Sequence, residues 1–317
     1  MSGSPRSSWD PGSIWGRRGT RCWHCPSPHG CPEPHPGLCR APLHAKQAAT
    51  LPCVTARRRG WGHGCAGSER PGDRVQPRHR AGARAAARRQ PPAPQHIFAT
   101  CRDPEGPGGK ALQELAAQHS SIKLVQLDTV NLSSIQSAMQ TVGNHLKDRG
   151  LNLLINNAGI SSHATLCSLD SQEMLDVFAT NVVGPLQVVK EFLPLLEQAA
   201  KGTGKEGLSC SRAAVINISS KLGSIGLCLR VPEAPMYPYR ASKAAQNMVT
   251  RCLAVELQDK GILCMAIHPG WVKTDMGTQE APLPVEHSVR GILTVLASLS
   301  QDTSGAFLDW EGNSLPW

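Results

Sequence analysis

The sequence has no apolar run of about 18 residues, the length that suggests a membrane-spanning helix, so we expect no membrane contact. No segment repeats at a period of about 20–50 residues, which excludes solenoids and propellers. The start of the chain also lacks the apolar core of a secretory signal. These absences favour a cytoplasmic protein in a reducing compartment. In the carboxyl-terminal two thirds of the chain, we expect most cysteines to be small apolar core residues.

Acidic residues are scarce in the first third of the chain, where residues 1–95 hold 16 Lys and Arg but only 4 Asp and Glu. Residues 96–317 hold 17 basic and 20 acidic residues, so the formal net charge of +9 arises from the first third. Residues 1–91 are rich in Pro, Gly and Arg, and they bury too little apolar surface to offset chain entropy. We therefore expect a disordered basic segment over residues 1–91 and a folded domain over residues 92–317.

Other functions are open for this basic segment. Arg57–Arg59 and Arg78–Arg89 could contact phosphates, but Trp61 is the one aromatic residue among them, so we do not expect a nucleic-acid partner. Cys22 and Cys25 form a CxxC pair without the second close pair of a structural zinc site, so we assign no metal site. The composition is also typical of a mitochondrial presequence, although its prolines and glycines oppose an amphipathic helix.

From about Gln95 onward, apolar runs alternate with helical patterns, which predicts βαβ units and a doubly wound α/β fold with a parallel sheet. Strands are expected at His96–Cys101, Ile122–Leu127, Leu151–Asn156, Ala213–Ile218, Ile262–Ile267 and Gly305–Leu308. Helices are expected at Gly108–His119, Leu132–Lys147, Gln172–Ala200, Tyr239–Gln258 and Glu286–Ser300, the third interrupted near Gly184 and Pro185.

Tyr239 and Lys243 are four residues apart on an expected helix and therefore share a face. A free tyrosine, with a pKa of about 10, is a poor acid–base catalyst at neutral pH. A neighbouring cation lowers that pKa, and a serine such as Ser220 can hold a carbonyl oxygen nearby. The pattern favours proton transfer at an oxygen while hydride moves at the adjoining carbon. An ordinary surface pair at helical spacing is the alternative.

These residues belong to a longer series of motifs in a fixed order. The series is Asn156-Asn157-Ala158-Gly159, Asn181, Ile218-Ser219-Ser220, Tyr239-Arg240-Ala241-Ser242-Lys243 and Pro269-Gly270-Trp271-Val272-Lys273-Thr274. Over residues 92–317 the chain thereby resembles the classical short-chain dehydrogenases/reductases. The stretches His96–Pro104 and Leu308–Trp317 point to the sniffer-type carbonyl reductases, or C-factor-like proteins, within that family. The resemblance implies a Rossmann-like fold that reduces a small carbonyl compound to an alcohol, or the reverse.

The resemblance assigns four residues to catalysis. Tyr239 would be the general acid that protonates the carbonyl oxygen, and Ser220 would hydrogen-bond that oxygen. Lys243 would lower the tyrosine pKa and bind the nicotinamide ribose. Asn181 would hold a water that links Lys243 to a proton relay. An asparagine inside a helix is unfavourable by propensity, which suggests a function, although a solvent-facing Asn181 is the alternative.

Further residues would bind the cofactor. Asn157, Ala158 and Gly159 follow a buried strand, where cofactors bind in open α/β sheets, although a plain turn is the alternative. Asp128 would contact the adenine or else serve in a turn or helix cap. The segment after the strand Ile262–Ile267 would meet the nicotinamide, or would in part only end that strand. Its residues are Pro269, Gly270, Val272 and Thr274.

Arg102 bears on the choice of cofactor because it follows the strand at whose end the family reads the adenosine ribose. An acidic residue there would favour NAD, whereas an arginine can accept a 2′-phosphate. Asp103 comes next, so the signal is mixed. We predict NADP(H) in preference to NAD(H).

The chain departs from the family at the glycine-rich phosphate loop, TGxxxGxG, which follows the first strand. The nearest match is Thr55–Gly62, where Ala56 replaces the first glycine while Gly60 and Gly62 keep the other two. The preceding Leu51–Val54 makes a poor buried strand because Pro52 lacks an N–H group. Residues 51–64 are therefore either a degenerate first strand and phosphate loop or a chance match.

This departure predicts a complete catalytic half and an impaired cofactor half. The alternative to an active reductase is a form with poor cofactor binding that acts as an interaction partner. The helices Gln172–Ala200 and Tyr239–Gln258 match those through which family members dimerise, so we expect a homodimer in either case.

Overall fold

The structure is a computed structural model that describes residues 53–56, 94–202, 207–228 and 235–317, all within one unit spanning Ala45–Trp317. In these ranges seven strands form one sheet in the order β3-β2-β1-β4-β5-β6-β7. The strands are β1 Cys53–Ala56, β2 His96–Cys101, β3 Ile122–Gln126, β4 Leu153–Asn156, β5 Ala214–Ile218, β6 Leu263–His268 and β7 Phe307–Asp309. The helices are α1 Pro107–Gln118, α2 Leu132–Leu146, α3 Ser171–Phe178, α4 Gly184–Gly202, α5 Tyr237–Glu256 and α6 Val285–Ser298.

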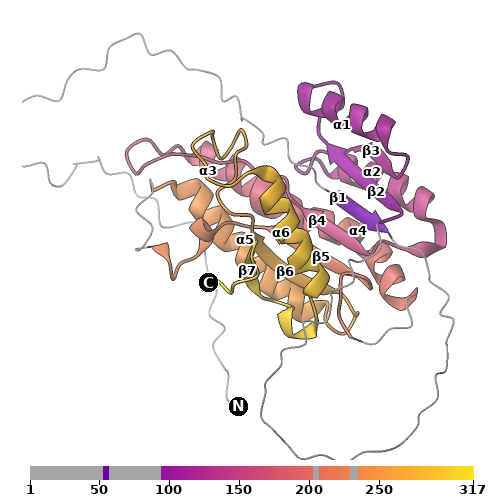
Figure 1. The fold of residues 1–317 in the computed structure, drawn as a ribbon. Coiled ribbons are helices and arrows are strands. Elements are labelled where there is room, and N and C mark those ends of the chain that lie inside the picture. The colour runs from indigo at the N-terminus through magenta and orange to yellow at the C-terminus, as the bar shows by residue number, and fades with distance from the viewer. Residues whose placement is uncertain (1–52, 57–93, 203–206, 229–234) are drawn as a thin grey trace, which may run out of the picture. The chain divides into compact units, whose positions relative to one another are not determined.

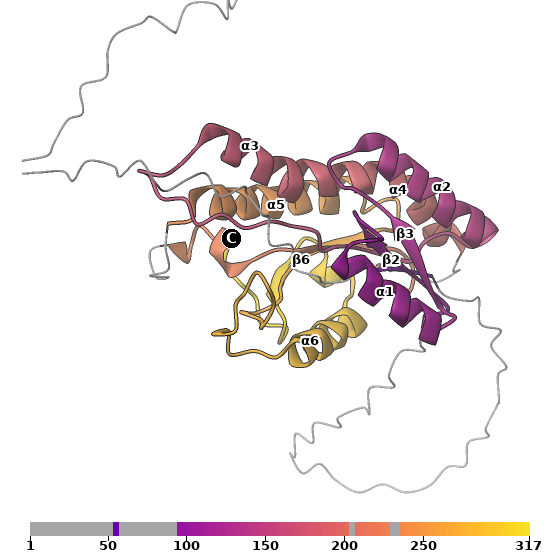
Figure 2. The same ribbon diagram turned by 90° about the horizontal axis from the view of Figure 1, so that it is seen from above.

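Helices cover both faces of the sheet. The helices α2, α4 and α5 lie over one face, and α1 and α6 lie over the other (Figures 1 and 2). This layering, together with the strand order, is that of doubly wound folds, so the predicted α/β class is confirmed. Every strand and helix expected after Gln95 is present, with its ends within two residues of the expected ones.

The first strand departs from the parallel pattern. β1 lies between β2 and β4 but runs antiparallel to both, with Cys53 opposite Ala99 and Ala56 opposite His96. The other adjacent pairs are parallel. A parallel connection needs a crossover, usually a helix, and the sequence between β1 and β2 carries no apolar helical pattern. A short antiparallel strand still pairs backbone groups of both neighbours.

The long helix expected over Gln172–Ala200 is divided into α3 and α4 by a π-helical turn at Ala179–Val183. The break therefore begins before Gly184, the position expected from sequence. A Cβ atom at Gly184 would lie 2.7 Å from the carbonyl oxygen of Thr129, so only glycine fits there. Pro185 follows directly, and because proline has no N–H it cannot donate to a carbonyl oxygen of the preceding π-helical turn.

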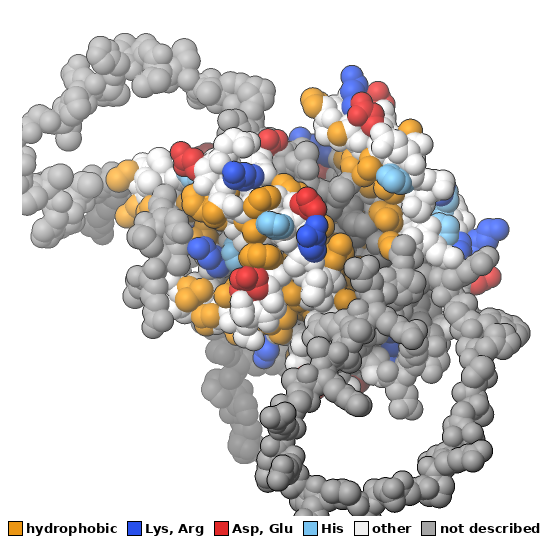
Figure 3. All heavy atoms as spheres, viewed as in Figure 1, with side chains coloured by type: hydrophobic (Ala, Val, Ile, Leu, Met, Phe, Trp, Pro, Cys, Tyr) orange, Lys and Arg blue, Asp and Glu red, His pale blue; other side chains and the backbone are white. Residues whose placement is uncertain are grey.

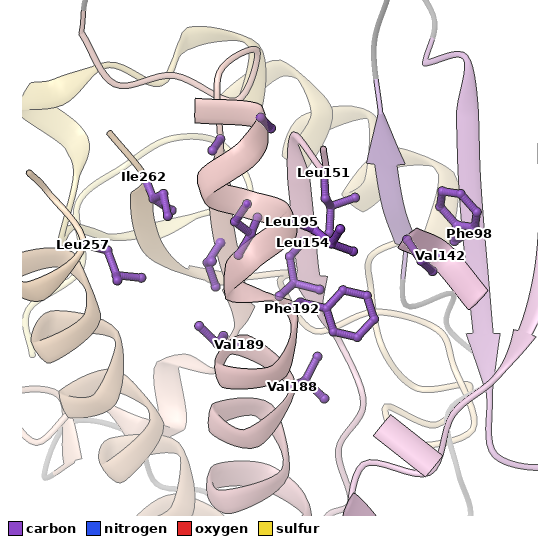
Figure 4. Packing of buried hydrophobic residues seen from close by; sticks show 14 of the residues in the cluster. Phe98, Val142, Leu151, Leu154, Val188, Val189, Phe192, Leu195, Leu257 and Ile262 are labelled. Carbon is purple, nitrogen blue, oxygen red and sulfur yellow. The ribbon is translucent and has the colours of Figure 1, made fainter. Parts of the chain in front are cut away.

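The largest core cluster joins strands on both sides of β1. Phe98 of β2 and Val142 of α2 belong to the same buried cluster as Phe192 of α4 and Leu154 of β4 (Figure 4). On the other face, β5 and β6 pack against α6 through a second cluster. Because β5 and β6 are buried on both faces, their carboxyl ends, where polar motifs follow, are held firmly in place.

Helix α6 also has an apolar stripe facing solvent. Val285, Val289 and Leu293 follow one another at helical spacing and are 42%, 45% and 57% exposed. Figure 3 shows hydrophobic side chains gathered over this helix among charged ones. The inner side of α6 contributes Val295 and Leu296 to the second core cluster. The stripe is therefore separate from the surface that holds α6 on the sheet.

Candidate active site

Three of the predicted catalytic side chains meet at the start of α5. Tyr239 and Lys243 lie on its inner face and are only 9% and 4% exposed. The side chain of Ser220 hydrogen-bonds that of Tyr239, and Lys243 Nζ lies 5.9 Å from the centroid of the tyrosine ring. The surface-pair alternative for Tyr239 and Lys243 therefore does not describe this structure.

The turn after β5 decides which serine faces the tyrosine. Ser220 precedes the short 3-10 helix η3, Lys221–Gly223, and its Oγ accepts a hydrogen bond from the N–H of Leu222 over 3.2 Å. Ser219 instead donates its hydroxyl to Asn247 Oδ1 over 2.6 Å. A Cβ atom at Gly223 would lie 2.6 Å from Lys243 Cβ, so a glycine there lets η3 pack directly on α5. The second serine of the pair is thus the one placed for chemistry.

Asn181 lies in the π-helical turn and is fully buried. Its amide exchanges two hydrogen bonds of 2.9 Å with the backbone of Ile160 and donates a third of 3.0 Å to Ser242 Oγ. A Cβ atom at Gly159 would lie 3.2 Å from Asn181 Oδ1 and 3.7 Å from Lys243 Nζ. Asn181 therefore ties the loop after β4 to the catalytic face of α5, and the solvent-facing alternative does not apply.

Burial sets the electrostatics of the tyrosine and lysine. It raises the pKa of Tyr239 above its ordinary value, while the hydrogen bond from Ser220 acts in the opposite direction. It lowers the pKa of Lys243 from 10.5 to about 7. The sequence predicts that the lysine lowers the tyrosine pKa; in the structure that pKa is raised, because desolvation outweighs the hydrogen bond from Ser220.

Residues predicted to meet the nicotinamide follow β6. Gly270 has φ of +87°, and a Cβ atom there would lie 2.5 Å from Leu283 Cδ2. Val272 forms an isolated parallel β-bridge with Leu283. Thr274 Oγ1 accepts from the N–H of Gly277 over 3.0 Å. Pro269 is fixed by Ser288, whose hydroxyl donates to its carbonyl oxygen over 2.6 Å.

The segment after β6 borders a hollow of about 420 Å³, which is lined by Thr274, Asp275, Thr278 and Gln279.

Asn157 and Ala158, like Gly159, directly follow β4. Because the carboxyl ends of parallel strands meet at one edge of a sheet, these residues and Ser220 lie at the same edge.

The predicted adenosine contacts also follow their strands at this edge. Arg102 comes directly after β2, and its carbonyl oxygen accepts from Gln126 Nε2 over 3.2 Å. Asp128 Oδ1 accepts from the N–H of Val130 over 3.1 Å, and its own N–H donates to Ser134 Oγ over 2.9 Å. The turn role for Asp128, one of the two alternatives, is therefore present.

Gly60 and Gly62, the candidate phosphate-loop glycines, lie outside the described residues. β1, the strand that precedes them in the sequence, is described. Its last residue, Ala56, is opposite His96, the first residue of β2. The chain therefore leaves β1 at the sheet edge opposite to Ser220 and Gly159, whereas a phosphate loop of the family's kind leaves at the same edge.

Sequence reasoning missed two polar residues near the site, the buried Gln246 and the partly buried His268. Gln246 is 1% exposed, and its Oε1 accepts from Lys243 Nζ over 3.0 Å. His268 ends β6, and burial together with the charge of Lys221 lowers its pKa to about 4. The signal for Gln246 was its spacing, since residues 239, 243, 246 and 250 form one polar stripe on α5. No comparable signal pointed to His268.

Two further observations concern the described part of the chain. It contains no cluster of three His, Cys, Asp or Glu side chains able to hold a metal ion. None of its helices combines the length and the apolar content needed to cross a bilayer.

A doubly wound sheet with a buried serine, tyrosine and lysine at its carboxyl edge defines a Rossmann-type oxidoreductase. The model of one such family, the short chain dehydrogenases, matches residues 83–282, and the chain belongs to that family.

Relatives and solved structures agree with this assignment. The chain is 38% identical to the C-signal protein of Myxococcus xanthus over 168 residues, which are 53% of this chain and 93% of that protein. An NADPH-bound carbonyl reductase from chicken fatty liver superposes with a TM-score of 0.68 at 47% identity, over 71% of this chain and 88% of the other. The carbonyl reductase Sniffer of D. melanogaster superposes with the same TM-score of 0.68 at 41% identity, over 72% and 90%.

Proposed function

We propose that this protein is an NADP(H)-dependent reductase of small aldehydes or ketones, with Tyr239 as its general acid. The observation that carries the proposal is the buried contact of Tyr239 with Ser220, beside Lys243, at the carboxyl edge of the sheet. The NADPH-bound state of the chicken carbonyl reductase supports the choice of cofactor.

The residues present fit the nicotinamide end of the cofactor. Gly159 leaves open space beside Lys243 Nζ that a Cβ atom would narrow. Asn157, Ala158 and Gly159 would line that end together with Pro269, Gly270, Val272 and Thr274. Arg102 would bind the 2′-phosphate, and Asp128 would lie near the adenine. The bound cofactor would supply the hydride.

The protein would supply the proton and the orientation. Ser220 would donate a hydrogen bond to the carbonyl oxygen of the substrate and polarise it. Tyr239 would transfer its hydroxyl proton to that oxygen as the alcohol forms. Lys243, next to the tyrosine ring, would favour the phenolate that remains, because its ammonium form is positively charged. The burial of all three residues excludes water that would compete for these hydrogen bonds.

The test is the oxidation of NADPH by the full chain with a panel of dicarbonyls and quinones, beside Tyr239→Phe. We expect that variant to lose about 10²- to 10⁴-fold in kcat/KM, because it lacks the proton donor. Tyr237→Phe is the matched control, since Tyr237 is 42% exposed and lies two residues away. Equal activity of Tyr239→Phe and wild type would refute the assignment.

A second function, a cofactor-poor form that pairs with another subunit, is favoured by the direction of β1. β1 runs antiparallel to β2 and β4, so its carboxyl end lies at the sheet edge opposite to Ser220. The helices expected to dimerise carry exposed apolar side chains, among them Leu175 at 63%, Met248 at 64% and Val255 at 76%. Calorimetric titration with NADPH separates the two functions, because sub-micromolar binding would exclude the cofactor-poor form. Light scattering of the purified chain would show whether it dimerises.

A further inference from the structure

We propose that Gln246 is a positioning residue of the catalytic pair: its amide oxygen fixes where the Lys243 ammonium lies and how readily that group keeps its proton. The inference rests on the proposed function, because it takes Tyr239 and Lys243 as the residues that move the proton. Gln246 would touch neither substrate nor cofactor and would act through Lys243 alone.

The contact is short and buried. Lys243 Nζ donates to Gln246 Oε1 over 3.0 Å and to the carbonyl oxygen of Ile218 over 2.7 Å. Gln246 lies three residues after Lys243 on α5, so the two side chains share the helical face that also carries Tyr239. With two of its donors engaged, the ammonium is held between the end of β5 and α5. Loss of either acceptor would let it move.

The orientation of the Gln246 amide follows from the lysine. An ammonium group has only donors, so it is the amide oxygen that must face it. The amide nitrogen then points away, and it is buried without a hydrogen-bond partner among the residues the structure describes. A buried unpaired donor destabilises a protein and calls for an explanation. The bond to Lys243 supplies that explanation, since an apolar residue would avoid the penalty but could not hold the ammonium.

Among the described residues, the polar partners of the lysine ammonium are two uncharged acceptors, the Ile218 carbonyl oxygen and Gln246 Oε1. Burial is the cause that lowers the pKa of Lys243 to about 7. The elements packed against α5 carry the following titratable groups: Lys221 on η3, Cys264 and His268 on β6, and Glu173 and Asp176 on α3. None of them shifts the lysine pKa. An acceptor at 3.0 Å therefore weighs heavily in the balance between the charged and neutral amine.

Two substitutions of Gln246 in the full-length chain should move this balance in opposite directions. Gln246→Met keeps the length of the side chain but removes the acceptor, so the titration midpoint of Lys243 should fall. Gln246→Glu puts a carboxylate beside the ammonium, so the midpoint should rise, and each shift should be about one pH unit or more. Thr250→Val is the matched control, because Thr250 is equally buried one turn further and donates to the Gln246 carbonyl oxygen but not to the lysine.

The midpoint is read by NMR of chains labelled at the lysine Cε, with the Lys243 signal assigned by its loss in Lys243→Met. Opposite shifts in the two Gln246 variants, with no shift in Thr250→Val, are the expected result. Unchanged midpoints, or shifts in one direction only, would overturn the inference. If Gln246→Met fails to fold, Gln246→Leu takes its place, because it also removes the acceptor.

Kinetics then separate this inference from the proposed function. The pH profile of kcat/KM should shift in the same direction as each midpoint, with the KM for the carbonyl compound unchanged. A chain without reductase activity would refute the proposed function, while its NMR midpoints would still test the role of Gln246.

Discussion

The hydroxyl of Ser224 donates a hydrogen bond of 2.6 Å to the carbonyl oxygen of Pro316, 92 residues further along the chain. The neighbouring Trp317 stacks on Phe307, with ring centroids 5.4 Å apart, and its indole lies under the guanidinium of Arg251. Ser224 comes four residues after Ser220. Pro316 and Trp317 therefore brace the segment that follows Ser220.

We expect Ser224→Ala to lower the free energy of unfolding by about 0.5–1.5 kcal/mol, because the hydrogen bond to the carbonyl oxygen of Pro316 would be lost. Urea denaturation of the full chain measures the change. The N–H of Leu227 also donates to Ser224 Oγ over 3.1 Å, so part of the loss would come from that turn. An unchanged denaturation midpoint would show that the brace adds nothing to stability.

A second prediction concerns the hydrogen bond from Ser220 to Tyr239. That bond lowers the tyrosine pKa against the effect of burial, so Ser220→Ala should raise the pKa further. The chain has only two tyrosines, so ultraviolet titration of the phenolate in a Tyr237→Phe background reports on Tyr239 alone. A fall in the pKa of Tyr239 after this substitution would show that the serine does not stabilise the phenolate.

The third prediction follows from the lowered pKa of Lys243. Between about pH 7 and 10.5 the unfolded chain binds this proton and the folded chain does not. The lysine therefore makes the free energy of unfolding rise with pH across this window, by at most about 1.4 kcal/mol per pH unit. Below the window the buried lysine is charged, and it destabilises the folded chain by its full amount. Compared with wild type, Lys243→Met should be most stabilised at pH 6 and less so at pH 9. A difference between the two proteins that is independent of pH would contradict the shift.

Much of the fold could be predicted because its signals are local. β5 and β6 are continuous apolar runs that are buried on both faces, and Tyr239 with Lys243 marks its helix by spacing alone. The motifs after β4, β5 and β6 then meet at one edge because parallel strands bring their ends together. This is why Ser220 and Gly159 could be placed beside α5 before the structure was known.

The rest depended on relationships that a sequence pattern does not carry. Four residues at Cys53–Ala56 can pair with β2 and β4 in either direction, and only the connection to β2 decides between them. The raised pKa of Tyr239 reflects how deeply the finished site is buried. The hydrogen bond between Lys243 and Gln246 depends on the direction in which the lysine side chain turns, and spacing on the helix does not determine that direction.

The core cluster that joins Phe98 and Val142 to Phe192 and Leu154 has a consequence for how this family tolerates change. It connects β2 and α2 to β4 and α4 through side chains on one face of the sheet, in addition to the backbone pairing that β1 provides. Under the proposed function, a substitution in β1 would therefore weaken binding of the nucleotide more than it would disturb the contact of Tyr239 with Ser220.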